Sequence, residues 1–319
     1  TEYAEDNAHA LTKNAVAYIN VDSFLGPVIS AAGAPSIAKL VIEVAKAVPA
    51  NRYFGNETEA SLYEQWTNQA AGRRNKSGAA VANAGTLAPD YLVSFMGSGS
   101  DFTPFYQHLG VIAANLVFGL EGGHYGVYHS TMDSVPYFEK FADPNFVTET
   151  TIARWWGLLA LRLADSHVIP FDFSTYGLVM DESLRGFEAK LAAKGFNIST
   201  TELRAAITSF DANAAVFHTG IASLESLSAD MDSVFVDKLN QKLINLERKL
   251  LTEDGLPHRP WYKHVIFGPG FYEGYSGTAF PGIDDGLVFK DDAQAIQKHV
   301  DEVARVVSSA AEYLVAAEE

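Results

Sequence analysis

Cysteine is absent from this chain of 319 residues, and the sequence holds no uninterrupted apolar run of about 18 residues, the length that a membrane-spanning helix needs. The first absence excludes disulfides, a thiolate nucleophile and cysteine-bound metals. Basic residues are scarce as well, with 23 Lys and Arg against 39 Asp and Glu and a net charge of −16. Because nucleic acids and anionic membranes attract basic surfaces, we expect no nucleic-acid partner.

Several hydrolase motifs are also missing. No serine stands in G-x-S-x-G, no H-E-x-x-H occurs, and no H-x-D segment or Glu-Glu pair precedes the first predicted strand. The α/β-hydrolase interpretation is thereby removed. The chain opens on Thr1 rather than on methionine, so we expect it to begin inside a longer protein, with any targeting segment upstream.

The first half of the chain alternates helix-like and strand-like segments. This alternation predicts an α/β domain over residues 1–170, with a mixed sheet flanked by helices. The strand-like runs are 16–23, 91–95 and 110–118, and an amphipathic helix starts at Pro35. Residues 68–90 are rich in Ala, Gly and Asn, and we predict a long loop there.

After residue 170 the sequence predicts helices almost throughout. Apolar residues recur three and four positions apart over 203–224, 236–250 and 296–314, as in the seams of long packed helices. We therefore predict an all-α helical-bundle domain over 171–319. A segment rich in glycine, proline and aromatic residues, 255–286, interrupts the bundle.

Two polar residues follow strand-like runs and suggest half of a metal site. Asp22 ends the run 16–23, and His129 lies in a polar loop after the run 110–118. A catalytic zinc takes about three protein ligands plus a water, so this pair alone is incomplete. Taken singly, Asp22 is more typical of a turn or cap, and His129 is more typical of a surface or hydrogen-bonded histidine. The loop 97–101, Gly-Ser-Gly-Ser-Asp, is typical of a helix start.

Six ordered motifs resemble glutamate carboxypeptidase II and its relatives, a family of co-catalytic zinc exopeptidases that also contains the non-catalytic transferrin receptors. The motifs are TEYAE at 1–5, VAYINVDS at 16–23, GSGSDF at 97–102, YHS at 128–130, LPHRP with YKHVI at 256–266, and FPGI at 280–283. The resemblance covers essentially the whole chain. It implies that residues 1–170 are the C-terminal part of the zinc peptidase domain and that 171–319 are the helical dimerisation domain.

The resemblance also implies roles for single residues. Asp22 and His129 match ligands of two different zinc ions, whose other ligands and general-base glutamate would lie upstream of Thr1. Tyr128 matches a tyrosine that stabilises the tetrahedral intermediate. The substrate-lining positions are Ser98, Gly99, Ser100 and Tyr275, although Ser100 replaces the family's asparagine. Glu2 and Glu5 match carboxylates of a structural calcium site, since oxygen ligands suit that ion.

Two departures from the glutamate-selective members bear on specificity. Those members have an arginine patch where this chain has Asn115, Leu116 and Val117, and a lysine where it has Gly274. A glutamate side chain would lose its charge-assisted partners here. We therefore expect an aminopeptidase or a non-glutamate carboxypeptidase, acting on apolar residues, with Val117 and Phe118 making the site more apolar.

The leading hypothesis is a dizinc metallo-exopeptidase of small peptides that works as a homodimer through its helical domain. Its activity would need the N-terminal segment of the same protein, in the same chain or as a separate one. The alternatives are a non-catalytic, transferrin-receptor-like binding protein and a bare oligomerisation module. Three N-x-S/T sequons, at Asn56, Asn75 and Asn197, favour the secretory pathway, and the protein would be secreted, vacuolar or a membrane-anchored ectodomain.

Overall fold

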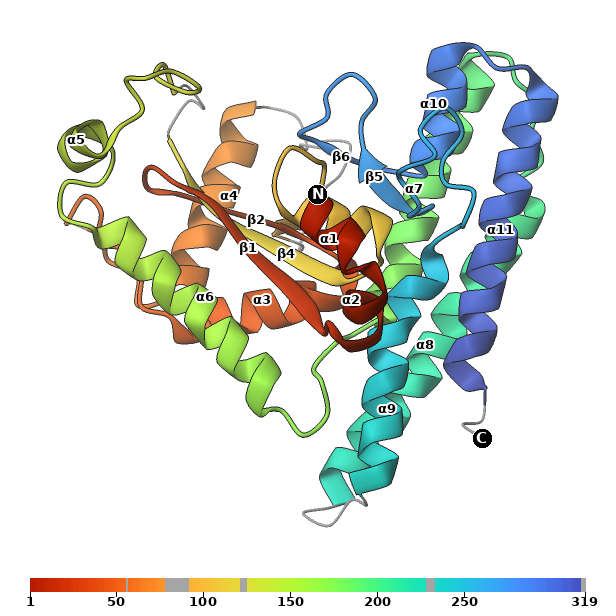
Figure 1. The fold of residues 1–319 in the computed structure, drawn as a ribbon, viewed down its shortest axis with the longest axis horizontal. Coiled ribbons are helices and arrows are strands. Elements are labelled where there is room, and N and C mark those ends of the chain that lie inside the picture. The colour runs from red at the N-terminus through yellow and green to blue at the C-terminus, as the bar shows by residue number, and fades with distance from the viewer. Residues whose placement is uncertain (56, 78–91, 121–124, 228–232, 317–319) are drawn as a thin grey trace.

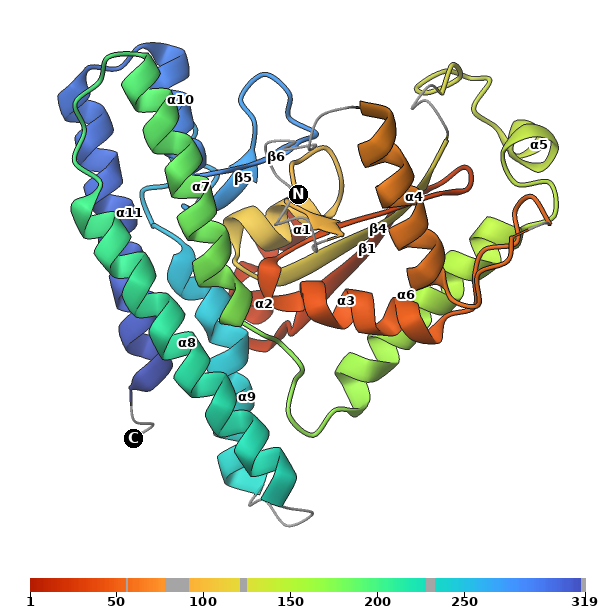
Figure 2. The ribbon, with the colours of Figure 1, turned by 180° about the vertical axis from the view of Figure 1, so that it is seen from behind.

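The computed structural model describes residues 1–55, 57–77, 92–120, 125–227 and 233–316. One half of the molecule is built on a mixed β-sheet, and the other half consists of long helices (Figure 1). Viewed from behind, the helices α7, α8, α9 and α11 stand beside the sheet half rather than over it (Figure 2). The predicted α/β part followed by a helical region is thereby confirmed.

The sheet has four strands in the order β1-β4-β2-β3. β1 runs parallel to β4, β4 runs antiparallel to β2, and β2 runs parallel to β3. The strands are β1 (Ala17–Phe24), β2 (Val28–Gly33), β3 (Val93–Ser94) and β4 (Ile112–Gly119). Because β1 and β4 are parallel neighbours, their carboxyl ends meet at one edge of the sheet.

Helices α3 (Pro35–Ala47) and α6 (Val147–Asp165) cover the sheet. α3 begins with a proline at its first position, where the missing N–H costs nothing, and buries Ile37 and Val41 completely. The indole of Trp155 in α6 donates to the carbonyl oxygen of Val41 at 3.1 Å. This bond satisfies the one polar group of a fully buried side chain.

The long loop predicted over 68–90 is wrong in its first part. Residues up to Ser77 belong to helix α4 (Leu62–Ser77), and 78–90 lie outside the described residues. The helix has almost no apolar periodicity after its first turns, so the pattern gave no signal. Trp66 anchors it, because its ring packs edge-on against Trp155 at 5.3 Å between centroids.

The three apolar seams form helices as predicted. They lie in α8 (Thr201–Leu227), α9 (Ser233–Leu246) with the short helix η4 (Glu247–Leu250), and α11 (Ala293–Val315), beside α7 (Ser174–Ala193). The segment between η4 and α11 carries the hairpin β5 (Phe267–Pro269) and β6 (Gly277–Ala279) and helix α10 (Pro281–Phe289). The remaining short helices are α1 (Glu2–Asp6), α2 (Ala8–Asn14), η1 (Pro104–His108), α5 (Val135–Tyr137) and η3 (Phe138–Ala142).

A buried carboxylate joins the two halves. Glu247 of η4 has no exposed surface. It accepts hydrogen bonds from Tyr176 Oη in α7, from His264 Nε2 at 3.1 Å and from Ser36 Oγ in α3 at 3.2 Å. Burial and the Glu247 charge together hold the pKa of Tyr176 well above its ordinary value. The phenol therefore stays protonated and continues to donate to Glu247.

None of the described helices is both long and apolar enough to cross a membrane.

Candidate functional site

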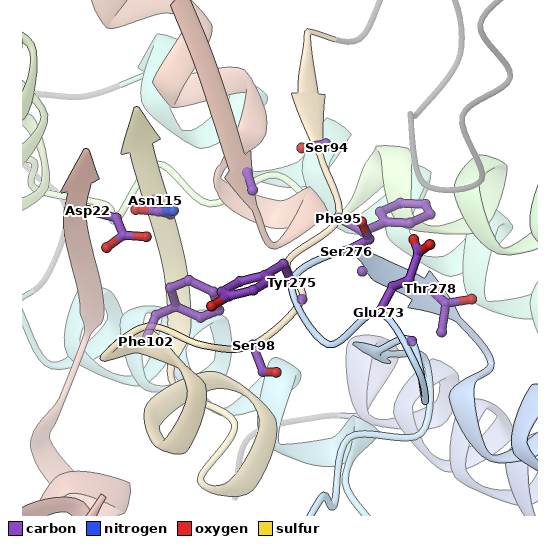
Figure 3. A pocket seen from close by; sticks show the side chains of 14 residues that line it. Asp22, Ser94, Phe95, Ser98, Phe102, Asn115, Glu273, Tyr275, Ser276 and Thr278 are labelled. Carbon is purple, nitrogen blue, oxygen red and sulfur yellow. The ribbon is translucent and has the colours of Figure 1, made fainter. Parts of the chain in front are cut away.

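Asp22 occupies a β-bulge at the carboxyl end of edge strand β1. Val21 pairs with Leu116 and Ser23 pairs with Val117, so Asp22 has no partner of its own on β4. An extra residue in one strand turns its side chain out of the regular alternation, and bulges are frequent beside active sites for that reason. The carboxylate is exposed and lies beside Asn115 at the margin of a cavity (Figure 3).

This cavity has a volume of about 660 Å3 and separates the sheet from the loop that precedes β6. Its walls come from both halves of the chain, since Ser98 and Phe102 lie on one side and Tyr275 and Thr278 on the other. Met96 and Ser276 form a β-bridge between the two walls. The full lining consists of Asp22, Ala32, Ser94, Phe95, Gly97, Ser98, Phe102, Asn115, Gly270, Glu273, Tyr275, Ser276, Gly277 and Thr278.

The two walls are in direct backbone contact, which requires glycine. A Cβ at Gly97 would stand 2.1 Å from the carbonyl oxygen of Tyr275. Gly99 has a φ of +85°, and a Cβ there would meet the Tyr275 ring at 2.6 Å. Ser98 donates from its backbone N–H at 2.6 Å and from its hydroxyl at 2.8 Å to the Gly274 carbonyl. The predicted loop 98–100 therefore positions Tyr275.

Tyr128 connects the predicted zinc-binding residues with Tyr275. Its phenol oxygen lies 3.1 Å from that of Tyr275, and its ring stacks on His129 at 3.8 Å between centroids. The hydrogen bond to Tyr275 raises the pKa of Tyr128, with smaller contributions from burial and from the charges of Tyr275 and Asp22. His129 thus contacts Tyr128 directly, and the charge of Asp22 contributes a little to the raised pKa of Tyr128.

His129 has a left-handed backbone, with a φ of 57°. This conformation is uncommon outside glycine, although asparagine, aspartate and histidine are enriched in it. The imidazole is exposed and its ring contact is with Tyr128. The residues before this loop, 121–124, are outside the described part of the chain.

Ser100 is not among the lining residues of the cavity and belongs to a small polar network. Asn20 Nδ2 donates to Ser100 Oγ at 2.9 Å and to Asn115 Oδ1 at 3.0 Å. Asn20 and Asn115 face one another directly in the β1–β4 register. The network fixes the side chain of Asn115 at the cavity wall.

The donor set suits zinc but is incomplete. A carboxylate and an imidazole are zinc ligands, yet the described residues contain no group of three His, Asp or Glu that could hold a metal ion. The same holds for the predicted calcium site at Glu2 and Glu5. Both lie on α1, and Glu5 accepts a hydrogen bond of 2.6 Å from the Trp261 indole.

The expectation that Phe118 makes the site apolar is wrong. Phe118 has no exposed surface and packs against Trp155 in the core. Side chains alternate along a strand, so Asn115 reaches the cavity while Leu116 and Phe118 face the opposite layer. Sequence reasoning also missed Glu273, which lines the cavity. The available signal was its place in the sequence. Glu273 directly precedes Gly274, the position at which the glutamate-selective members have a lysine.

Comparison with known proteins adds to this geometry. Residues 198–315 match the transferrin receptor-like dimerisation domain. The chain is 36% identical to the probable glutamate carboxypeptidase LAMP1 of Arabidopsis thaliana over 288 residues, which are 90% of this chain and 38% of the relative. It is 30% identical to a probable glutamate carboxypeptidase of Arthroderma benhamiae over 305 residues, 93% of this chain and 38% of the relative.

A relative named for a different activity matches at an identity similar to that of the fungal protein. The chain is 30% identical to aminopeptidase NAALADL1 of Rattus norvegicus over 292 residues, which are 89% of this chain and 37% of the relative. The chain therefore spans somewhat more than a third of the length of these relatives. Carboxypeptidases and aminopeptidases both remove terminal residues from peptides.

Proposed function

Because the chain belongs to the glutamate carboxypeptidase and transferrin receptor-like family and corresponds to the C-terminal part of its relatives, we propose that it forms one part of a dizinc exopeptidase. The observation that carries the proposal is the arrangement around Tyr128. This tyrosine stacks on His129, bonds to Tyr275 and lies within the electrostatic reach of Asp22. The proximity of Tyr128 to an imidazole and to a residue of the cavity wall supports the proposal.

In this proposal Asp22 and His129 each hold a different zinc ion, and the remaining ligands and the general base come from outside this chain. Zinc ions held there would supply Lewis-acid activation of water and of the scissile carbonyl. The bulge at Asp22 leaves its side chain at the cavity margin, and His129 is held against Tyr128 by ring stacking.

The other site residues bind and orient the substrate. The Tyr128 hydroxyl donates to the oxyanion that forms at the scissile carbonyl. Its partner Tyr275 aims that hydroxyl and covers the terminal residue of the peptide. Ser98 and Gly99 hold Tyr275 in place through the Gly274 carbonyl and the close glycine contact.

The helical region serves assembly. We propose a boundary near residue 170, with residues 171–319 forming a homodimer contact, because 198–315 match a dimerisation domain. Further parts of the proposal are a structural calcium ion at Glu2 and Glu5, completed by ligands from the N-terminal segment, and a location in the secretory pathway. Among the asparagines of the three N-x-S/T sequons, Asn197 is exposed, and Asn56 lies outside the described residues.

The test uses the full-length protein that contains this chain. We expect it to bind two zinc ions, measured by elemental analysis, and to hydrolyse dipeptides and aminoacyl reporters. Asp22→Ala and His129→Ala should each lower the zinc content by about half, as for loss of a first ligand. His9→Ala, at an exposed histidine of α2, is the matched control. A zinc-free protein without turnover would overturn the proposal and favour a transferrin-receptor-like binding protein.

A further inference from the structure

The cavity carries negative charge and no described cation. Among its lining residues the charged side chains are Asp22 and Glu273, and there is neither a lysine nor an arginine in the set. The other lining residues have hydroxyl, amide or aromatic side chains, or are alanine and glycine. If Asp22 binds a metal ion, Glu273 is the remaining charged side chain of this lining that a substrate residue can contact.

Glu273 lies at the end of the cavity away from the proposed metal site. Asp22 and Asn115 lie at one end, the Tyr275 ring lies between, and Glu273 lies beyond it with Thr278 (Figure 3). The Glu273 side chain is exposed, and its carboxylate has no hydrogen bond or ion pair to the part of the chain that the structure describes. It is therefore available to a ligand.

Asn115 supplies a second polar group on the cavity wall. The residue is only 8% exposed, and its Oδ1 accepts from Asn20. Its amide nitrogen has no partner among the described residues, although it lies on the cavity wall. A donor that loses water without gaining an acceptor is costly, so a ligand that fills the cavity would need an oxygen at this position.

We propose that the cavity selects a lysine or arginine residue of the peptide, with Glu273 pairing its terminal cation. This proposal rests on the exopeptidase function proposed above and names its substrate class. The substrate carbonyl accepts from the Asn115 amide near Asp22, and the side chain extends past Tyr275 to Glu273. Aromatic rings from Phe95, Phe102 and Tyr275 cover the methylene stem, as apolar surfaces commonly do for lysine.

The same arrangement disfavours the alternatives. An acidic residue would place its carboxylate against Glu273 without a compensating cation, and like charges at close range repel. An apolar residue would fill the stem region but leave Glu273 without a partner. The expectation of an apolar specificity rested partly on Phe118, which is in the core.

The test compares lysine with norleucine, which keeps the straight side chain and lacks the ammonium group. Zinc-loaded full-length protein would be assayed on dipeptides that differ only in this residue, with arginine and glutamate versions alongside. We expect kcat/KM for lysine and arginine to exceed that for norleucine by about 10- to 100-fold, the value of a charge-assisted hydrogen bond. Glu273→Gln should abolish this preference, and Glu273→Asp should retain most of it.

Glu253→Gln is the matched control, because it removes the same charge at an exposed residue outside the cavity. Its lysine preference should equal that of the wild type. Equal rates on lysine and norleucine peptides, or a preference that survives Glu273→Gln, would overturn the proposal.

A second measurement separates this proposal from the exopeptidase function. Free L-lysine should raise the melting temperature of the zinc-loaded protein more than free L-norleucine does, and Glu273→Gln should remove the difference. If no peptide is hydrolysed, the exopeptidase function fails while this difference still supports the selectivity. Equal stabilisation by the two amino acids contradicts the selectivity, whatever the turnover.

Discussion

The phenol oxygens of Tyr128 and Tyr275 lie 3.1 Å apart although 147 residues separate them in the sequence. One tyrosine follows the loop after β4 in the sheet half, and the other precedes β6 in the segment inserted among the long helices. Their contact means that the cavity is complete only when both halves are folded against each other. The following predictions depend on that joint construction.

The first prediction separates the roles of the two tyrosines. Tyr128→Phe removes the donor to the oxyanion, so we expect kcat of the full-length enzyme to fall about 100-fold, as for loss of one such donor. Tyr275→Phe keeps that donor but releases its orientation, so we expect mainly a higher KM. Steady-state kinetics on one dipeptide measures both effects. A fall in kcat for Tyr275→Phe as large as that for Tyr128→Phe would contradict the assignment.

The second prediction concerns the close contact of the two walls. Gly97→Ala places a methyl group 2.1 Å from the present position of the Tyr275 carbonyl oxygen, so the Tyr275 loop must shift. A displacement of about 1 Å can cost about 100-fold in rate, and we expect kcat/KM to fall by that order. Gly186→Ala is the control, because nothing lies within 4 Å of the point on α7 that its Cβ would occupy. It should leave the kinetics unchanged and stabilise the helix by about 0.5–1 kcal/mol.

The third prediction tests the buried carboxylate between the halves. Glu247→Ala leaves Tyr176, His264 and Ser36 without their shared acceptor in a site with no exposed surface. Removing one partner of such a buried network costs about 3–5 kcal/mol of unfolding free energy. Denaturant unfolding measures this loss. Glu253→Ala, at an exposed position, should change the stability by no more than about 0.5 kcal/mol.

The fourth prediction is a loss of stability in acid caused by His299. Burial lowers the pKa of His299 to about 4, and the nearby Glu302 charge offsets only part of this effect. In the unfolded chain the imidazole takes up a proton near its ordinary pKa of 6.5. The folded state is therefore favoured fully above pH 6.5, and this contribution is lost as the pH falls toward 4.

His299→Gln should flatten that pH dependence. The wild type should lose about 3 kcal/mol more than the variant between these pH values. Asp285 is present in both proteins, so the comparison removes its contribution to the pH dependence. That contribution has the opposite sign, because burial raises the pKa of Asp285 to about 6 despite the adjacent Arg259. Thermal melts over this pH range measure the difference. Parallel pH profiles for the wild type and His299→Gln would refute the prediction, and His9→Gln serves as the exposed control.

The sequence predicted the helices and strands whose apolar pattern lies within a single element. The apolar seams of α8, α9 and α11 repeat every three or four residues, and the strands β1 and β4 are short apolar runs. α4 was mistaken for a loop beyond residue 68 because its polar turns carry no such repeat. Its position depends on Trp66 packing against Trp155, a contact between distant residues.

Asp22 and His129 could be selected from the sequence, because the first lies near the end of a strand, the second lies in a loop after a strand, and each matches a family motif. The sequence by itself also determined the two-part architecture and the zinc-compatible donor types, since these are properties of local periodicity and residue chemistry. Only the tertiary structure decided which side chains face the cavity. Strand register sends Asn115 into it and Phe118 into the core, and the packing of the two walls brings Tyr275 and Glu273 beside residues far away in the chain.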